Sequence, residues 1–266
     1  MRLLSIASGS SGNSMLVQMD GINILIDAGV SCRRITRALK EYSTSLSALD
    51  AVLITHAHTD HISGLPALMS KLSCSVYMSR DTQIQTMLYG VTDIIPDVQF
   101  DICEKIRVTP FSSMHDCRGS LGFVLESSRE KLGYLTDTGF IPEKAFEIMA
   151  GSDCVVIESN HDSEMLKNGP YPFYLKKRIA SDIGHLSNDA CSEALIALAK
   201  TGTKSFLLAH LSRQNNTPEL ARASAEEALS GFDAETDVLP PETVKQYLIN
   251  EDDLYKQISL EMLNEE

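Results

Sequence analysis

One short segment limits what this chain can fold into more than any other. Residues 55–61 read Thr-His-Ala-His-Thr-Asp-His and follow directly after the apolar run at 51–54. A short run of apolar, β-branched residues predicts a buried strand. The polar side chains therefore leave the core together at the carboxyl end of a strand, which is where α/β folds build their sites.

The spacing of these side chains predicts metal binding. The groups concerned are His56, His58, Asp60 and His61. Imidazole and carboxylate groups bind zinc, manganese or iron. Four ligands from a single short loop are more than one small ion can bind with good geometry. The pattern therefore favours two neighbouring ions over the alternative of an ordinary histidine packed in the core.

These residues carry a family resemblance. Residues 55–64, Thr-His-x-His-x-Asp-His-x-x-Gly, resemble the signature of the metallo-β-lactamase-fold hydrolases. The opening segment 7–14 and the segments 158–162, 184–188 and 210–212 are similar to the YycJ/WalJ branch of that superfamily. Members of this branch are bacterial proteins regarded as nucleases, and the likeness covers nearly the whole chain.

Pattern alone predicts a mixed α and β fold in one domain. The chain has 266 residues, of which 43% are hydrophobic, and no linker or internal repeat divides it. The resemblance implies more: an α/β (α+β) fold with the four-layer αββα sandwich of the metallo-β-lactamase hydrolases over residues 1–266. One β layer would begin at Met1 and end near Thr109, and the other would run from about Phe111 to Glu266.

Several local elements are expected from short patterns. The pair Asp20-Gly21 separates two apolar runs and predicts a two-residue hairpin turn. Ser31 is placed to cap one helix at its N-terminus, and Thr217, followed by a proline, to cap another. A last strand is expected around 238–239, followed by helical, acidic residues to the end of the chain.

Composition argues against several classes of protein. The six cysteines form no Cys-x-x-Cys pair, which argues against a thiolate zinc site and a disulfide framework. No signal-peptide pattern and no apolar stretch of about 20 residues occurs, so we expect a cytoplasmic protein without a membrane partner. The net charge of −13 disfavours broad coating of a polyanion, yet a local site with two divalent ions could still take a phosphate.

Three residues further along the chain complete the ligand set that the resemblance implies. His115 and His210 each follow an expected strand, and Asp137 stands before Thr-Gly at the tip of another. By resemblance, one ion is held by His56, His58 and His115, the other by Asp60, His61 and His210, and Asp137 bridges them. Two divalent ions are expected, with zinc first and manganese or iron as alternatives, because availability decides among metals at such sites.

The expected chemistry is hydrolysis by a hydroxide that bridges the two ions. Two divalent ions can share a water molecule and lower its pKa, so that hydroxide attacks phosphorus. By resemblance, Asp60 and Asp137 orient this hydroxide, and His185 assists the leaving group as the extra histidine of phosphodiesterases in this superfamily. A structural alternative for His185 is capping of the helix region that follows. The candidate substrate contacts are Asn13, Asn160 and His161.

Three functions follow from this ligand set. The first is a phosphodiesterase that acts on nucleic acid, and the resemblance suggests a DNA 5′–3′ exonuclease. Residues 171–178 interleave aromatics with cations, a pairing that stacks bases and holds phosphates, although core aromatics with a solvated basic end would give the same pattern. The second is a thioesterase like glyoxalase II, or a lactonase, with the same metal centre. The third is a regulatory protein of a cell-wall signalling pathway, which the resemblance alone suggests.

Overall fold

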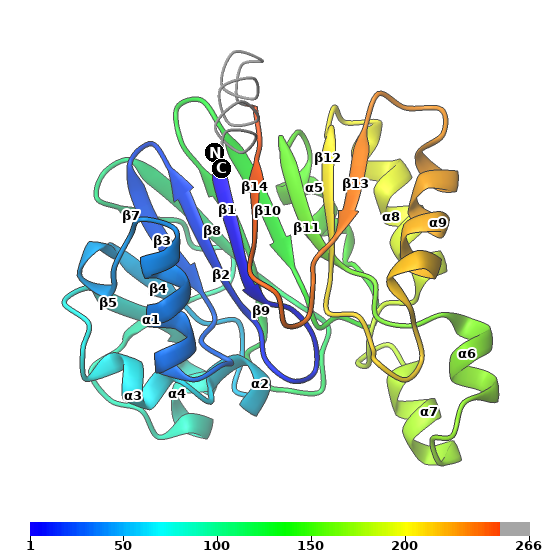
Figure 1. Cartoon of the computed structure of the whole chain (residues 1–266), viewed down its shortest axis with the longest axis horizontal. Helices are drawn as coiled ribbons and strands as arrows, with labels where there is room; N and C mark the ends of the chain where they lie inside the picture. The colour runs from blue at the N-terminus through cyan, green and yellow to red at the C-terminus, as the bar shows by residue number, and fades with distance from the viewer. Residues whose placement is uncertain (251–266) are drawn as a thin grey trace, which may run out of the picture.

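Two β-sheets packed face to face form the centre of the molecule (Figure 1). The computed structural model describes residues 1–250. In spatial order, the first sheet contains β14 (Lys245–Leu248), β1 (Arg2–Ala7), β2 (Ser14–Met19), β3 (Ile22–Ile26), β4 (Ala51–Leu53), β5 (Ser75–Ser79) and β6 (Thr92–Ile94). The second contains β13 (Glu235–Val238), β12 (Ser205–Ala209), β11 (Cys154–Glu158), β10 (Lys131–Leu135), β9 (Leu121–Glu126), β8 (Ile106–Ser112) and β7 (Phe100–Ile102).

Helices follow many of the strands of both sheets (Figure 1). The first half of the chain contains α1 (Cys32–Glu41), a short 3-10 helix (Leu46–Ala48), α2 (Thr59–Ile62), α3 (Leu65–Met69) and α4 (Arg80–Thr86). The second half contains α5 (Glu143–Met149), α6 (Ser163–Asn168), α7 (Phe173–Ile179), α8 (Asn188–Ala199) and α9 (Pro218–Leu229). Helices α1, α3, α5, α8 and α9 pack on the outer sides of the two sheets, whereas α6 and α7 project from the second half (Figure 1). None of the helices within residues 1–250 is long and apolar enough to cross a membrane.

The apolar side chains form three layers, which confirm the expected αββα sandwich. Successive side chains of a strand point to opposite faces of its sheet. In β1, Leu3 packs between the two sheets, whereas Leu4 packs under α1 and α3. In β11, Val156 packs between the sheets, whereas Val155 packs under α5, α8 and α9. Both faces of each sheet are thus covered, one by the other sheet and one by helices.

The short-range predictions are confirmed. Asp20 and Gly21 connect β2 to β3 with φ of 48° and 79°, as a two-residue hairpin turn with both φ positive requires. Ser31 accepts a hydrogen bond from the amide of Arg34 at the start of α1. Thr217 does the same at the start of α9. These features depend only on residues that are neighbours along the chain, so they can be predicted from the sequence.

The expected division of the chain between the two layers is wrong at both ends. Residues 100–112 form β7 and β8, which pair within the second sheet because β8 makes a long antiparallel ladder with β9. Residues 245–248, expected to be helical, form β14 and pair with β1 at the edge of the first sheet. The rest of the expected acidic helix, 251–266, lies outside the described residues.

Candidate metal centre

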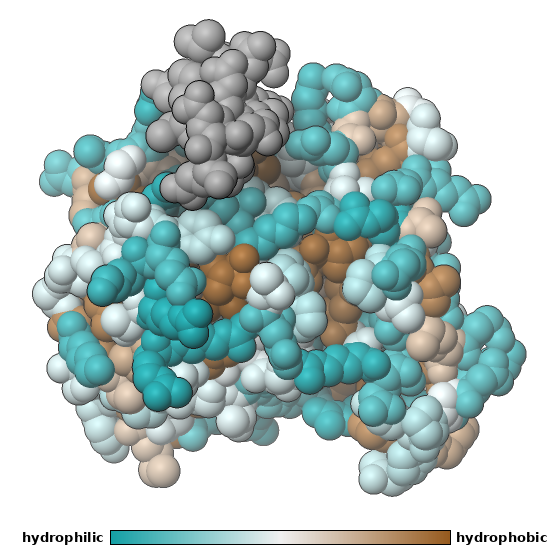
Figure 2. All heavy atoms as spheres, viewed as in Figure 1, coloured by the Kyte–Doolittle hydropathy of each residue, from teal (hydrophilic) through white to brown (hydrophobic). Residues whose placement is uncertain are grey.

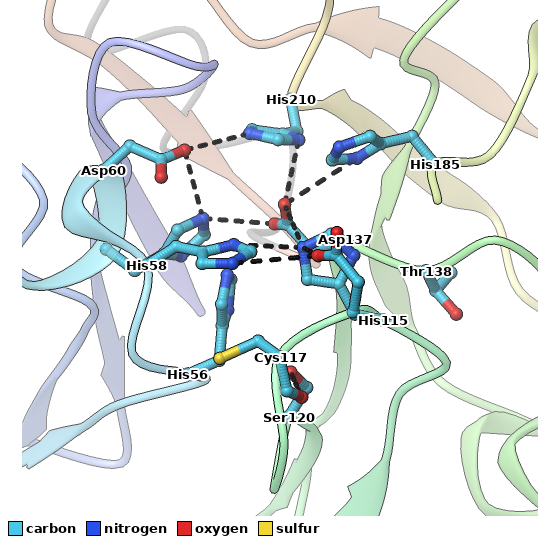
Figure 3. Close-up of polar contacts among 12 residues, drawn as sticks. His56, His58, Asp60, His115, Cys117, Ser120, Asp137, Thr138, His185 and His210 are labelled. Atoms are coloured by element: carbon cyan, nitrogen blue, oxygen red, sulfur yellow. Dashed lines mark hydrogen bonds and ion pairs between the residues drawn. The ribbon is translucent and has the colours of Figure 1, made fainter. Parts of the chain in front are cut away.

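The expected metal ligands lie together at the edge where the parallel strands of both sheets end (Figure 3). Ligating atoms within 4.8 Å of one another belong to His56, His58 and His115 in one group and to Asp60, His61 and His210 in another. A third such group joins Asp137 to His56 and His61. Asp137 therefore lies between the first two groups, in the position expected of a shared ligand.

The backbone turns sharply where three strands end at this edge. Asp27 follows β3, Asp137 follows β10 and His210 follows β12, with φ of 59°, 55° and 56°. Such left-handed backbone is uncommon for residues other than glycine, and surrounding structure must hold it in place. Other residues, such as Asp20 in its hairpin turn, share this backbone conformation, but these three are the ones that place side chains of the site.

Two buried carboxylates hold two of the histidine rings from behind. His61 Nδ1 donates to Asp27 Oδ2 over 2.7 Å, and His210 Nδ1 donates to Glu158 Oε1 over 2.8 Å. A carboxylate on the outer nitrogen fixes both the tautomer and the orientation of an imidazole. The inner Nε2 atoms then face Asp60 Oδ2, at 3.6 Å from His61 and 3.4 Å from His210.

Uncharged acceptors orient the other group of rings. His56 Nδ1 donates to the hydroxyl of Thr55 over 3.0 Å, and His115 Nδ1 donates to the carbonyl oxygen of Gly184 over 3.0 Å. His115 Nε2 then lies only 3.1 Å from His58 Nδ1. These two nitrogens point into the same space, where their lone pairs could serve one cation.

Two buried atoms of the expected ligands have no hydrogen-bond partner among residues 1–250. They are His56 Nε2 and Asp137 Oδ2, although the latter lies 3.1 Å from His61 Nε2. Buried polar atoms without partners are rare and cost free energy, so each requires a physical explanation. Nitrogen and carboxylate donors that converge in this way fit divalent metal ions.

The electrostatics of the site also favour bound cations. Burial disfavours ionisation of Asp137, but the rings of His210 and His61 outweigh it and hold the pKa of that carboxyl well below its ordinary value. Burial likewise acts against ionised Glu158, but His185 outweighs it, and the pKa of Glu158 is about 2. Buried ionised carboxylates need positive partners, which protonated histidines or metal ions can supply.

The histidines respond to this charge in two ways. Burial, together with the neighbouring His61 ring, places the pKa of His56 well below its ordinary value. His56 is therefore neutral and has a lone pair available for a metal. Burial opposes protonation of His210 as well, but Asp137 outweighs it and raises the pKa of His210 to about 10. The pocket around Asp137 thus stabilises positive charge.

Asp27 and Glu158 are the two residues of the site that sequence reasoning missed. Asp27 also accepts hydrogen bonds from the amide and the hydroxyl of Thr55. Glu158 also accepts from the amides of Thr138, over 2.9 Å, and Leu186, over 3.1 Å. Each carboxylate stands at the end of a buried strand, which is the signal that pointed to the other candidates and could have pointed to these.

His185 lies beside both groups of expected ligands. Its Nδ1 donates to Glu158 Oε1 over 2.8 Å, and its ring centre is 5.0 Å from that of His115 and 5.3 Å from that of His210. The side chain keeps 20% of its surface exposed. It does not cap the following helix, because the Ser187 side chain accepts from the first turn of α8. His185 is thus held in place on one side and open on the other.

Asn13, a predicted substrate contact, lies among the expected metal ligands. Its side chain is buried, and its amide nitrogen is 3.3 Å from both the backbone oxygen and Oδ2 of Asp60. The same nitrogen is 2.9 Å from His61 Nε2, while Asn13 Oδ1 accepts from the amide of Gly9. Asn13 therefore connects the Ser/Gly turn to two expected ligands.

The two other candidate substrate contacts are separated. Asn160 donates to the backbone oxygen of His210 over 2.9 Å and lines the cleft beside His185. His161 is buried and lines a second hollow, between α6 and α7. Of this pair, the structure brings Asn160 to the expected ligands and directs His161 toward the helices next to them.

The cleft above the expected ligands has a volume of about 170 Å³. His115, Asp116 and His185 line one part of it, and Arg178 on α7 lines another. Asp116 Oδ1 lies 3.5 Å from His115 Nε2, and its other oxygen pairs with Arg178 at 2.5 Å. An ion pair thus joins the loop of one expected ligand to α7.

Comparison with known proteins decides the family. The sequence matches the family described as beta-lactamase superfamily domain over residues 22–211. It is 35% identical to exodeoxyribonuclease YycJ of Bacillus anthracis, over 84% of this chain and 87% of that protein. The chain belongs to the YycJ/WalJ branch of the beta-lactamase superfamily.

Other members and structural neighbours of the superfamily agree with this placement. Exodeoxyribonuclease WalJ of Streptococcus pneumoniae serotype 2 is 36% identical over 86% of this chain and 88% of its own length. The metallo-beta-lactamase fold protein YhfI from Bacillus subtilis superposes with a TM-score of 0.69 at 17% identity, over 92% of this chain and 99% of YhfI. At that identity the likeness to YhfI concerns the fold alone, and it confirms the αββα sandwich expected of a YycJ/WalJ protein.

Proposed function

We propose that this protein is a nuclease that hydrolyses phosphodiester bonds of DNA with two divalent metal ions. The observation that carries the proposal is the convergence of two ligand groups on one carboxylate, Asp137. Relatives named exodeoxyribonucleases that are 35% and 36% identical over most of their length support DNA as substrate. The 5′–3′ direction remains an expectation from the resemblance, and a cytoplasmic location remains an expectation from the sequence.

Each ion has its own set of protein ligands in this proposal. The first would be held by His56, His58 and His115, the second by Asp60, His61 and His210, and Asp137 would serve both. Zinc is the expected metal, with manganese or iron as alternatives, because nitrogen and carboxylate donors accept all three. When bound, two such ions lower the pKa of a water molecule and stabilise charge on the departing oxygen.

Residues of the site also orient the attacking water molecule and transfer protons. Asp60 and Asp137 each present a carboxylate oxygen near His61 Nε2, where they can orient a water molecule for attack on phosphorus. His185 has Nδ1 fixed by Glu158, which leaves Nε2 to give a proton to the departing oxygen in the cleft. Asn160 lines the same cleft and can donate to a phosphate oxygen.

A direct assay tests the proposal. Purified metal-free protein is reloaded with zinc or manganese and incubated with end-labelled DNA, with a model thioester and a lactone in parallel. We expect DNA to be degraded, and the substitutions Asp137→Ala and His58→Ala to remove this activity. Asp233→Ala, a substitution of an exposed aspartate distant from the site, is the matched control and should retain it.

Two results would contradict the proposal. If the Asp137 and His58 variants degrade DNA as fast as the wild type, the activity belongs to a contaminating nuclease. If the loaded protein turns over the thioester or the lactone and leaves DNA intact, the same ligands serve a different bond.

A further inference from the structure

We propose that α7 is the surface on which this protein binds a single-stranded DNA end next to the metal centre. The inference rests on the proposed function and adds to it the form of the substrate. Figure 1 shows α6 and α7 projecting together from the second half of the molecule, on the side where the parallel strands end. The helix therefore lies beside the cleft without being part of the expected ligand set.

The C-terminal end of α7 is fixed to the site by close contacts. The amide of His185 donates to the backbone oxygen of Ile179 over 2.9 Å. A Cβ atom at Gly184 would lie 2.2 Å from the same oxygen, so only glycine permits this approach. Arg178 pairs with Asp116, the neighbour of the expected ligand His115. Whatever binds along α7 is therefore held at a set position relative to the cleft.

The exposed part of α7 carries aromatic rings that the core does not use. Phe173 is 82% exposed and Tyr174 is 74% exposed, and no residue of α7 is buried. This excludes the alternative that these aromatics belong to the core. In Figure 2 the projecting part at the lower right presents apolar residues beside hydrophilic ones. Uncovered rings of this size commonly mark a binding surface.

The charge on α7 indicates what binds there. Its last turn contains Lys176, Lys177 and Arg178, in a protein with a net charge of −13. Arg178 pairs with Asp116, and Lys176 donates to the uncharged backbone oxygen of Lys167. A local group of cations next to exposed rings complements a strand that offers phosphates and unpaired bases. Base faces are accessible in single strands and stacked away in a duplex. Charge complementarity and the open rings thus favour single-stranded DNA as the occupant.

Two hollows continue this surface on the other sides of the helix. Leu175 and Arg178 face the cleft that also contains His185. Phe173 and Lys176 face a hollow of about 480 Å³ that lies between α6 and α7. A strand that stacks on the exposed rings can therefore continue into the cleft along one helix.

Binding and turnover measured separately test the inference. The metal-loaded protein is titrated into a fluorescein-labelled oligothymidylate with phosphorothioate linkages, which resists hydrolysis, and anisotropy gives Kd. We expect the double variant with Phe173→Ala and Tyr174→Ala to bind about five-fold more weakly, or worse, for each base that loses its stacking partner. Tyr174→Phe keeps the ring and should bind as the wild type does. Tyr89→Ala, at a ring that is 82% exposed near α4, is the matched control.

The salt dependence tests the cations. Loss of one phosphate contact from a single strand should reduce the slope of log K against log salt by about 0.7. We expect this change for Lys177→Ala and none for Lys200→Ala, an exposed lysine at the far end of α8. Hydrolysis of bis(p-nitrophenyl) phosphate should be unchanged in all of these variants, because this small substrate fits the cleft and the varied side chains do not line it.

The outcomes separate this inference from the proposed function. Absence of DNA hydrolysis by the wild type would contradict the proposed function itself. If the wild type degrades single-stranded DNA and the Phe173/Tyr174 variant binds it equally well, only the role of α7 is wrong. Equal loss of affinity for duplex DNA, tighter binding of RNA than of DNA, or a change in oligomeric state in place of a change in DNA binding would also overturn it.

Discussion

The two sheets contribute to the candidate site in different ways. The first sheet supplies its ligands from a single loop after β4, whereas the second supplies each of its ligands from the end of a different strand. Both use a buried carboxylate to hold a histidine ring, Asp27 on the first side and Glu158 on the second. Glu158 holds two rings, of His185 and His210, and Asp27 holds one. Each side thus has one supporting carboxylate, but that of the second side holds twice as many rings.

The largest effect is expected for His185, a histidine of the second side that has no counterpart on the first side. His185→Ala should lower kcat on DNA by about 10²- to 10⁴-fold, the usual contribution of a proton donor, with metal content unchanged. Hydrolysis of bis(p-nitrophenyl) phosphate should fall little, because its leaving group needs no proton. Elemental analysis and the two assays check this, and an equal loss on both substrates would assign His185 to the support of the metal centre instead.

A smaller but still large effect is expected from Glu158→Gln. A carboxylate that supports metal ligands usually contributes about 10- to 100-fold to metal affinity or activity, and Glu158 holds two rings, so we expect the upper end. The measurement is competition with a chromophoric chelator, together with the rate on DNA. Metal affinity like that of the wild type would contradict the role given to Glu158.

The equivalent change on the first side should cost less. Asp27 contacts one ring directly, that of His61, and otherwise accepts from Thr55, so Asp27→Asn should lower metal affinity by about 10-fold. Only one of the two ions should become easier to remove, and stepwise chelation monitored by elemental analysis would resolve it. If Asp27→Asn and Glu158→Gln weaken metal binding equally, the contrast between the two sides is lost.

The smallest effects are expected for the helix caps, and the loss of stability should be the same in the two halves of the chain. Ser31→Ala and Thr217→Ala each remove the side-chain cap of a helix that carries no expected ligand, α1 and α9. Each should lower the free energy of unfolding by about 1 kcal/mol, measured by urea denaturation, with DNA hydrolysis unchanged. A loss of activity in either variant would show that its helix also positions the site.

Different parts of the site were open to prediction to different degrees. The cluster at 55–61 could be read directly, because its ligands are close in the sequence and follow a clear strand. Asn13 stays a predicted substrate contact, and only the structure shows that its side chain is buried against Asp60 and His61, since its turn folds back onto the loop after β4. The aromatic and cationic segment at 171–178 was ambiguous until the exposure of Phe173 decided between core and surface.

The sequence by itself determined the elements that depend on neighbours along the chain: the hairpin turn at Asp20-Gly21, the caps at Ser31 and Thr217, and the spaced ligands after β4. Only the tertiary structure decided that β7 and β8 belong to the second sheet and that β14 closes the first. It also decided that Glu158 lies between His185 and His210, which are 27 and 52 residues away along the chain. Contacts at such separations depend on how the sheets pack, so they cannot be predicted from local patterns of charge and hydrophobicity.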